Sequence, residues 1–142
     1  EEMIQKILLA IDGSHCSEQA LYFAASLARS YHASIVLVHA FIPPPHPGSD
    51  GPTPESIYET REQAESLAEE AAGRLREMGI EDVESIVVKG PAINVITGTA
   101  ESYKPDMVII GARGQSLWPG NQLGSVSMAV TQRVECPVLV VR

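Results

Sequence analysis

Short apolar runs alternate with amphipathic stretches from one end of the chain to the other. The apolar runs predict strands at residues 6–11, 33–41, 83–89, 106–110 and 137–141. The stretches between them predict helices at 14–31, 56–78, 91–103 and 125–134. Strands that alternate with helices form a parallel sheet with helices on both faces. We therefore expect an α/β fold, a three-layer α/β/α sandwich that residues 1–142 form as one domain.

Residues 42–54 interrupt this alternation, because they contain six prolines and two glycines. Proline lacks the backbone N–H that helices and inner strands need, so the segment is predicted to be an exposed, semi-rigid loop. A plain connection, a lid over a ligand and a proline-rich docking segment all remain open as roles for this loop.

Composition and charge exclude several classes of protein. Ten basic and eighteen acidic residues give a net charge of −8, whereas a nucleic-acid-binding surface needs clustered Lys and Arg. The chain has no apolar run near the ~18 residues of a membrane span, so we expect neither nucleic acid nor membrane as a partner. Its two cysteines and four histidines show no metal-ligand spacing. Two free thiols suit a reducing compartment, and we expect a cytoplasmic protein.

Small and polar residues directly follow two of the predicted strands. Asp12 opens the segment 12–14 after the first strand, and Gly111 opens the segment 111–114 after the fourth. Open parallel sheets bind ligands beyond the carboxyl ends of the strands, where the strand order reverses. We therefore expect a ligand site between the first and fourth strands.

The glycines that follow the fourth strand suit an anion. Gly111 and Gly114 permit a positive φ and a close approach of backbone to a bound group. Gly124 and Ser125 open a helix, whose free N–H groups and positive dipole end attract phosphate. The Ser125 hydroxyl can bind phosphate or cap the helix. Spacing alone does not exclude a second interpretation, in which these glycines are turn and cap residues and do not bind phosphate.

The chain resembles the universal stress protein family over essentially all 142 residues. Its glycines follow the pattern G-x2-G-x9-G-[S/T] that is typical of the ATP-binding branch of that family, with every position filled. The segments that carry the resemblance are 6–14, 90–92, 106–114, 123–127 and 136–141.

The resemblance implies a site for ATP at the predicted edge of the sheet. It implies that Asp12 contacts the ribose or adenosine portion, with Ile11 beside it, and that the backbone around Ala40 and Phe41 reads the adenine edge. The remaining implied nucleotide-binding residues are Gly111, Arg113, Gly114, Gly124, Ser125 and Val126.

The same resemblance implies a cation, a strand order and a partner. Mg²⁺ or Mn²⁺ would bridge the phosphates, the five parallel strands would lie in the order 3-2-1-4-5, and the last strand would join two copies into a homodimer. One departure concerns the spacer 115–123, which has no Lys or Arg where many relatives carry basic residues. Arg113 is then the basic residue nearest to the triphosphate, and we expect affinity to depend on the metal.

We expect a non-catalytic, dimeric regulator of stress responses, because the sequence lacks the Walker lysine of an efficient NTPase. Two alternatives remain: a slow ATPase or nucleotidyl-transfer enzyme on the same scaffold, and an interaction module without nucleotide. His39 is expected to be a hydrogen-bonded, partly buried histidine rather than a catalyst, and Cys136 to belong to the core. The acidic stretch that contains Glu59, Glu62, Glu65, Glu69 and Glu70 is expected to be a solvated helix face.

Overall fold

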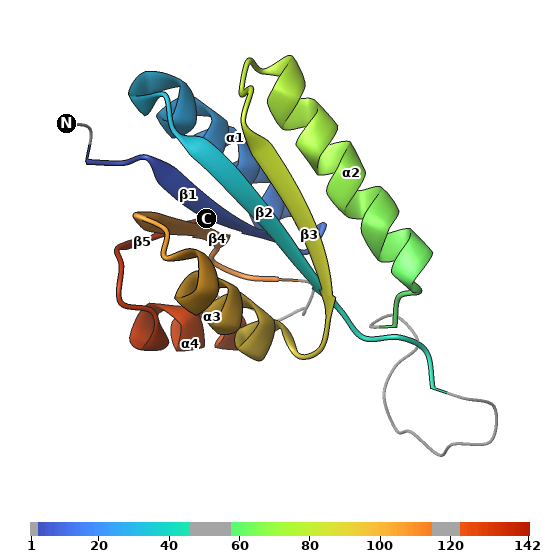
Figure 1. The fold of residues 1–142 in the computed structure, drawn as a ribbon. Coiled ribbons are helices and arrows are strands. Elements are labelled where there is room, and N and C mark those ends of the chain that lie inside the picture. The colour runs from blue at the N-terminus through green and yellow to red at the C-terminus, as the bar shows by residue number, and fades with distance from the viewer. Residues whose placement is uncertain (1–2, 46–57, 115–122) are drawn as a thin grey trace.

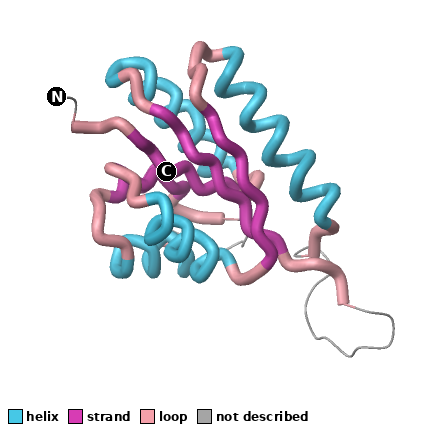
Figure 2. Tube along the Cα trace, viewed as in Figure 1, coloured by secondary structure: helices cyan, strands magenta, loops and turns pink. Residues whose placement is uncertain are grey.

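Helices and strands alternate strictly along the chain in the computed structural model, which describes residues 3–45, 58–114 and 123–142. Figure 2 shows the strands side by side with helices around them. The predicted α/β fold is therefore confirmed. The elements are β1 (Lys6–Ile11), α1 (His15–Tyr31), β2 (Ser34–Phe41), α2 (Arg61–Glu77), β3 (Val83–Lys89), α3 (Ala92–Tyr103), β4 (Met107–Gly111), α4 (Ser125–Arg133) and β5 (Val138–Val141).

The described strands form a five-stranded parallel sheet in the order β3-β2-β1-β4-β5. This is the order that the family resemblance implied. In the register, Ile11 at the end of β1 lies opposite His39 of β2, and Gly111 at the end of β4 lies opposite Val141 of β5. The order reverses between β1 and β4, so the segments after these two strands emerge side by side at one edge.

A helix layer covers each face of the sheet: α1 and α2 lie on one face, and α3 and α4 on the other (Figure 1). Side chains of β1 alternate between two apolar clusters, with Leu9 on the α1/α2 side and Leu8 on the α3/α4 side. Both side chains are fully buried. Burial on both faces explains why β1 is a continuous apolar run rather than an alternating one.

The start of α2 differs from the prediction. The helix was expected from residue 56, but residues 58–60 are not helical and α2 begins at Arg61. Thr60 caps the helix in a reciprocal capping box with Gln63, which supplies partners for backbone N–H groups of the first turn. Before the cap, Tyr58 forms a bridge with Ile42. Residues 46–57, which include most of the proline-rich segment, lie outside the described residues.

The remaining boundaries agree with the prediction to within one residue. Ser14 caps α1 by accepting a hydrogen bond from the Ser17 backbone N–H at 3.2 Å. Both cysteines are free thiols, and Cys136 packs half-buried against the α3/α4 cluster, where burial raises the pKa of its thiol. In the part of the chain that the structure describes, no helix is long and apolar enough to cross a membrane.

Candidate functional site

Asp12 leaves the sheet at the carboxyl end of β1 and turns its carboxylate back onto the backbone. Its Oδ1 accepts a hydrogen bond from the Ser14 N–H at 2.9 Å, and its own backbone N–H donates to Ser17 Oγ at 3.0 Å. This is the side-chain-to-backbone turn that aspartate favours at strand ends. Asp12 is half-buried, so its carboxylate is oriented by the turn while the residue remains partly accessible.

Gly114 lies directly against this carboxylate. A Cβ added at Gly114 would stand 2.5 Å from Asp12 Oδ2. The Ser14 hydroxyl also donates to the carbonyl oxygen of Arg113 at 3.4 Å. The segments that follow β1 and β4 therefore touch, as expected from the two strand ends.

Gly111 packs against the start of α1 rather than against Asp12. A Cβ added there would stand 2.8 Å from the backbone carbon of Cys16 and 2.9 Å from the nitrogen of Ser17, so the end of β4 packs directly on the first turn of α1. Neither Gly111 nor Gly114 adopts the positive φ that glycine permits. Among the glycines near this edge, Gly13 has the left-handed φ, at 82°. Close packing, rather than an unusual φ, is what requires glycine at 111 and 114.

The start of α4 is tied to the same loop. Gly124 is the N-cap residue, and its N–H donates to the carbonyl oxygen of Ala112 at 2.8 Å. Ser127 Oγ donates to that oxygen as well, at 2.7 Å. Ser125 is the first helical residue and is exposed, so the suggestion that it caps the helix is wrong. Val126 is half-buried and packs against the α3/α4 cluster.

Two helix starts and one basic side chain lie at this edge, beside the Asp12 carboxylate. The amino termini of α1 and α4 both lie beside the segment 112–114, as the contacts of Gly111 and Gly124 show. Each helix start presents backbone N–H groups and the positive end of a dipole. Arg113, half-buried, lies in the same segment. Within residues 3–45, 58–114 and 123–142, no three His, Cys, Asp or Glu side chains gather in a group that could hold a metal ion.

Ala40 and Phe41 end β2 at the same edge of the sheet. Ala40 packs half-buried against the α3/α4 cluster. The Phe41 side chain is buried, with the Arg61 guanidinium 5.0 Å from the centre of its ring, and its carbonyl oxygen accepts from the Gly90 N–H at 3.0 Å. The Phe41 carbonyl therefore already has one partner, and the adenine-reading role of this backbone stays a prediction.

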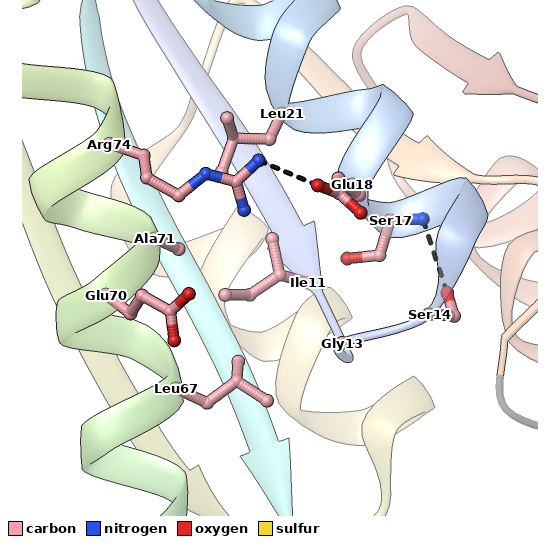
Figure 3. A pocket seen from close by; sticks show the side chains of 10 residues that line it. All are labelled: Ile11, Gly13, Ser14, Ser17, Glu18, Leu21, Leu67, Glu70, Ala71 and Arg74. Carbon is pink, nitrogen blue, oxygen red and sulfur yellow. Dashed lines mark hydrogen bonds and ion pairs between the residues drawn. The ribbon is translucent and has the colours of Figure 1, made fainter. Parts of the chain in front are cut away.

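A cavity of about 310 Å³ opens between α1 and α2 at the carboxyl end of β1 (Figure 3). Arg74 reaches across it from α2 to Glu18 of α1, with its Nη2 3.0 Å from a carboxylate oxygen. Of the predicted site residues, Ile11 lines this cavity. The lining consists of Ile11, Gly13, Ser14, Ser17, Glu18, Leu21, Leu67, Glu70, Ala71 and Arg74.

A polar pair next to the site, formed by the buried His39 and the half-buried Glu59, was not predicted. His39 Nε2 lies 2.8 Å from Glu59 Oε1, and His39 Nδ1 lies 2.9 Å from the Ile11 carbonyl oxygen. His39 is therefore hydrogen-bonded, as expected, and it is buried more completely than the partial burial that was predicted. The assignment of Glu59 to a solvated helix face is wrong, because Glu59 precedes the Thr60 cap of α2 and turns inward. The other acidic residues of that set, Glu62, Glu65, Glu69 and Glu70, lie exposed on α2 as predicted.

Part of the predicted site falls on residues that the structure does not describe. The spacer between Gly114 and Gly124 runs through 115–122, which are outside the described residues. The structure thus brings together Asp12, Arg113, Gly114 and Gly124, and places Gly111 under them against α1.

Comparisons with known proteins agree along the whole length of the chain. A model of the universal stress protein family matches residues 3–142. A curated relative from Thermus aquaticus, a universal stress protein in the QAH/OAS sulfhydrylase 3′ region, is 31% identical over 140 residues, which are 99% of this chain and 100% of the relative.

Two solved structures have the same fold. A universal stress protein in complex with cAMP superposes with a TM-score of 0.75 at 25% identity, covering 98% of this chain and 97% of the other. The protein UspA from Lactobacillus plantarum superposes with a TM-score of 0.82 at 18% identity, covering 98% of each chain.

Proposed function

The chain belongs to the universal stress protein family, and we propose that it binds an adenine nucleotide at the carboxyl edge of its sheet, between β1 and β4. The observation that carries this proposal is the contact between the Asp12 carboxylate and Gly114, beside the amino termini of α1 and α4. A carboxylate suits ribose hydroxyls or an adenine amino group, whereas helix starts suit phosphate. The arrangement thus offers complementary partners to the two ends of a nucleotide. A relative of the same fold has been crystallised with cAMP.

ATP is the nucleotide that the complete glycine pattern favours. Because the net charge of the chain is −8, the phosphates would be held by N–H groups of residues 113–114 and of the start of α4, together with the Arg113 side chain. The Ala112 N–H is not counted among them, because it donates to the Val141 carbonyl oxygen at 2.6 Å. The described residues form no cluster that could hold a metal ion. Mg²⁺ or Mn²⁺ would therefore be carried by the phosphates and would offset their charge.

A cyclic mononucleotide is a second candidate ligand. It is favoured by the absence of Lys and Arg from the spacer 115–123, because one phosphate charge needs less compensation than a triphosphate. The complex of a relative with cAMP also supports a cyclic mononucleotide as the ligand. In that case affinity would not depend on a divalent cation.

The biological role that we propose is that of a non-catalytic, cytoplasmic regulator of stress responses. The regulator would be a homodimer joined through β5, an edge strand whose residues Val138, Leu139 and Val140 are half-buried within one chain. Pairing of two such edges would cover these side chains and their free backbone groups. Sedimentation velocity tests the assembly, and a single species with the 15.3 kDa mass of one chain would contradict the dimer.

Thermal unfolding with a panel of ligands tests the binding. ATP, ADP, AMP, cAMP and GTP are added one at a time, with and without Mg²⁺. A ligand present at 100 times its dissociation constant stabilises the native state by about 2.7 kcal/mol, which is a readily measured rise in Tm. An adenine nucleotide is expected to give this rise and GTP is not. Asp12→Ala serves as the matched variant, in which the rise should be lost.

A further inference from the structure

The peptide bond that joins Ile11 to Asp12 is held at both of its polar atoms by side chains. The carbonyl oxygen of Ile11 lies 2.9 Å from His39 Nδ1, and the N–H of Asp12 donates to Ser17 Oγ at 3.0 Å. His39 and Ser17 are both buried, with 3% and 4% of their surface exposed. Two buried polar side chains thus converge on the peptide that carries the Asp12 carboxylate.

The hydrogen-bond partners of His39 determine where its ring carries hydrogen. A backbone carbonyl oxygen accepts hydrogen bonds and cannot donate them, so Nδ1 must carry the hydrogen that points at Ile11. The other nitrogen, Nε2, is 2.8 Å from Glu59 Oε1. An imidazolium facing a carboxylate satisfies this contact, and so does a neutral ring facing a carboxylic acid. Both arrangements place hydrogen on Nδ1, and Glu59 fixes the ring by engaging the opposite nitrogen.

We propose that His39 is a positioning residue for the nucleotide site: its Nδ1–H holds the Ile11 carbonyl and thereby aims Asp12 at the ligand. This inference rests on the proposed nucleotide-binding function, because the role of His39 is exerted through Asp12. Ile11 and His39 are register partners at the very end of the β1–β2 pairing, so backbone pairing no longer holds the chain beyond them. Beyond this point the hydrogen bonds from His39 and to Ser17 hold the peptide between Ile11 and Asp12 in place.

Glu59 extends this arrangement to the start of α2. Its backbone N–H donates to the carbonyl oxygen of Ile42 at 2.9 Å, while its carboxylate engages His39. Thr60, the next residue, caps α2. The amino terminus of α2 and the end of β1 are therefore joined through one histidine ring, in the order Glu59, His39, Ile11.

Two amide substitutions separate the two hydrogen bonds of the ring. His39→Asn places an amide N–H near the position of Nδ1 and can still donate to Ile11. His39→Gln is one carbon longer and reaches toward Glu59 instead. Thr99→Val serves as a stability control, because the buried Thr99 hydroxyl donates to the Val95 carbonyl on α3, in the other helix layer. It loses a buried hydrogen bond without touching the proposed site.

Calorimetric affinity for the adenine nucleotide that binds the wild type is the first measurement. His39→Gln is expected to weaken binding by about tenfold, since loss of one oriented hydrogen bond is worth about one power of ten. His39→Asn and Thr99→Val should stay within about twofold of the wild type. Equal losses for the Asn and Gln variants, or a Gln variant that binds as well as Thr99→Val, would overturn the proposal.

Nuclear magnetic resonance of the free protein is the second measurement, and it does not depend on nucleotide. The His39 ring is expected to show a protonated Nδ1, and the Asp12 amide resonance should move in His39→Gln but not in Thr99→Val. A ring protonated at Nε2 alone would overturn the proposal. If no adenine nucleotide binds the wild type, the proposed function fails, while the Nδ1 and Asp12 resonances still decide whether His39 positions this peptide.

Discussion

Replacement of Gly114 by alanine tests whether this glycine makes room for the Asp12 carboxylate. The added Cβ would stand 2.5 Å from Asp12 Oδ2, whereas ordinary contacts begin at 3.4 Å. The carboxylate must therefore move by about 0.9 Å, the difference between these two distances. Such a movement strains or breaks the 2.9 Å hydrogen bond that Oδ1 accepts from the Ser14 N–H.

The expected loss of stability depends on which group has to move, and here it is the Asp12 carboxylate. Because the clash is with the end of a side chain and not with backbone, the free energy of unfolding should fall by only about 1–2 kcal/mol, the value of one strained hydrogen bond to a charged group. For a chain of this size that corresponds to a fall in Tm of about 3–6 °C. Nucleotide affinity should fall by about tenfold or more, since the reoriented carboxylate belongs to the proposed site.

A double-mutant cycle isolates the contact. In an Asp12→Ala background the carboxylate is absent, so Gly114→Ala should then cost less than about 0.5 kcal/mol, and the coupling between the two positions should be about 1 kcal/mol. Gly98→Ala is the matched control: a Cβ added at this exposed glycine of α3 meets nothing within 4 Å. That variant should be stabilised by about 0.5–1 kcal/mol, as expected for glycine replaced by alanine inside a helix.

Chemical denaturation measures all four stabilities of the cycle. An equal cost of Gly114→Ala in the presence and absence of the Asp12 carboxylate would refute the steric explanation. So would a Gly114→Ala variant that is as stable as Gly98→Ala and binds nucleotide as the wild type does.

Three further predictions concern residues around the site and the core. Gly111→Ala should lower the free energy of unfolding by about 2–3 kcal/mol in urea titration, because its Cβ would meet the backbone of α1 at 2.8 Å; a loss below that of Gly114→Ala would contradict the packing. Thr60→Ala should cost about 1 kcal/mol in thermal unfolding by removing the capping box of α2, and an unchanged Tm would show that the cap contributes nothing. Burial raises the pKa of the Cys136 thiol, because it disfavours the charged thiolate. The neutral thiol therefore contributes to the free energy of unfolding below the ordinary thiol pKa, and this contribution is lost as pH rises through the raised pKa. Cys136 should therefore react with thiol reagents near neutral pH more slowly in the native than in the denatured protein, and equal rates would contradict its burial.

Much of the fold could be predicted because the signals are local. A continuous apolar run such as residues 6–11 indicates a strand buried on both faces, and β1 is buried on both faces. The start of α2 is predicted too early because residues 56–60 contain no proline or glycine that would separate them from the helix. Its position is set by the Thr60 cap and by the bridge between Tyr58 and Ile42, and the bridge joins residues that are distant in the sequence.

The candidate site was predictable where strand ends carry its residues, and not where tertiary contacts do. The positions of Asp12 and Gly114 after β1 and β4 predicted that they would meet. The inward turn of Glu59 was missed, because it depends on a contact with His39 across 20 residues. The one available signal was an ionisable side chain in an inner strand. Spacing also cannot tell a glycine that faces a ligand from one, such as Gly111, that packs against a helix.

Isothermal titration calorimetry with wild type and Asp12→Ala tests the central claim most directly. ATP and cAMP are titrated separately, each with and without Mg²⁺. Saturable binding of one adenine nucleotide per chain is expected for the wild type, with affinity lost in Asp12→Ala while both proteins remain folded by circular dichroism. A folded wild type that takes up neither nucleotide under any of these conditions would contradict the account, and equal affinity in Asp12→Ala would place the site elsewhere.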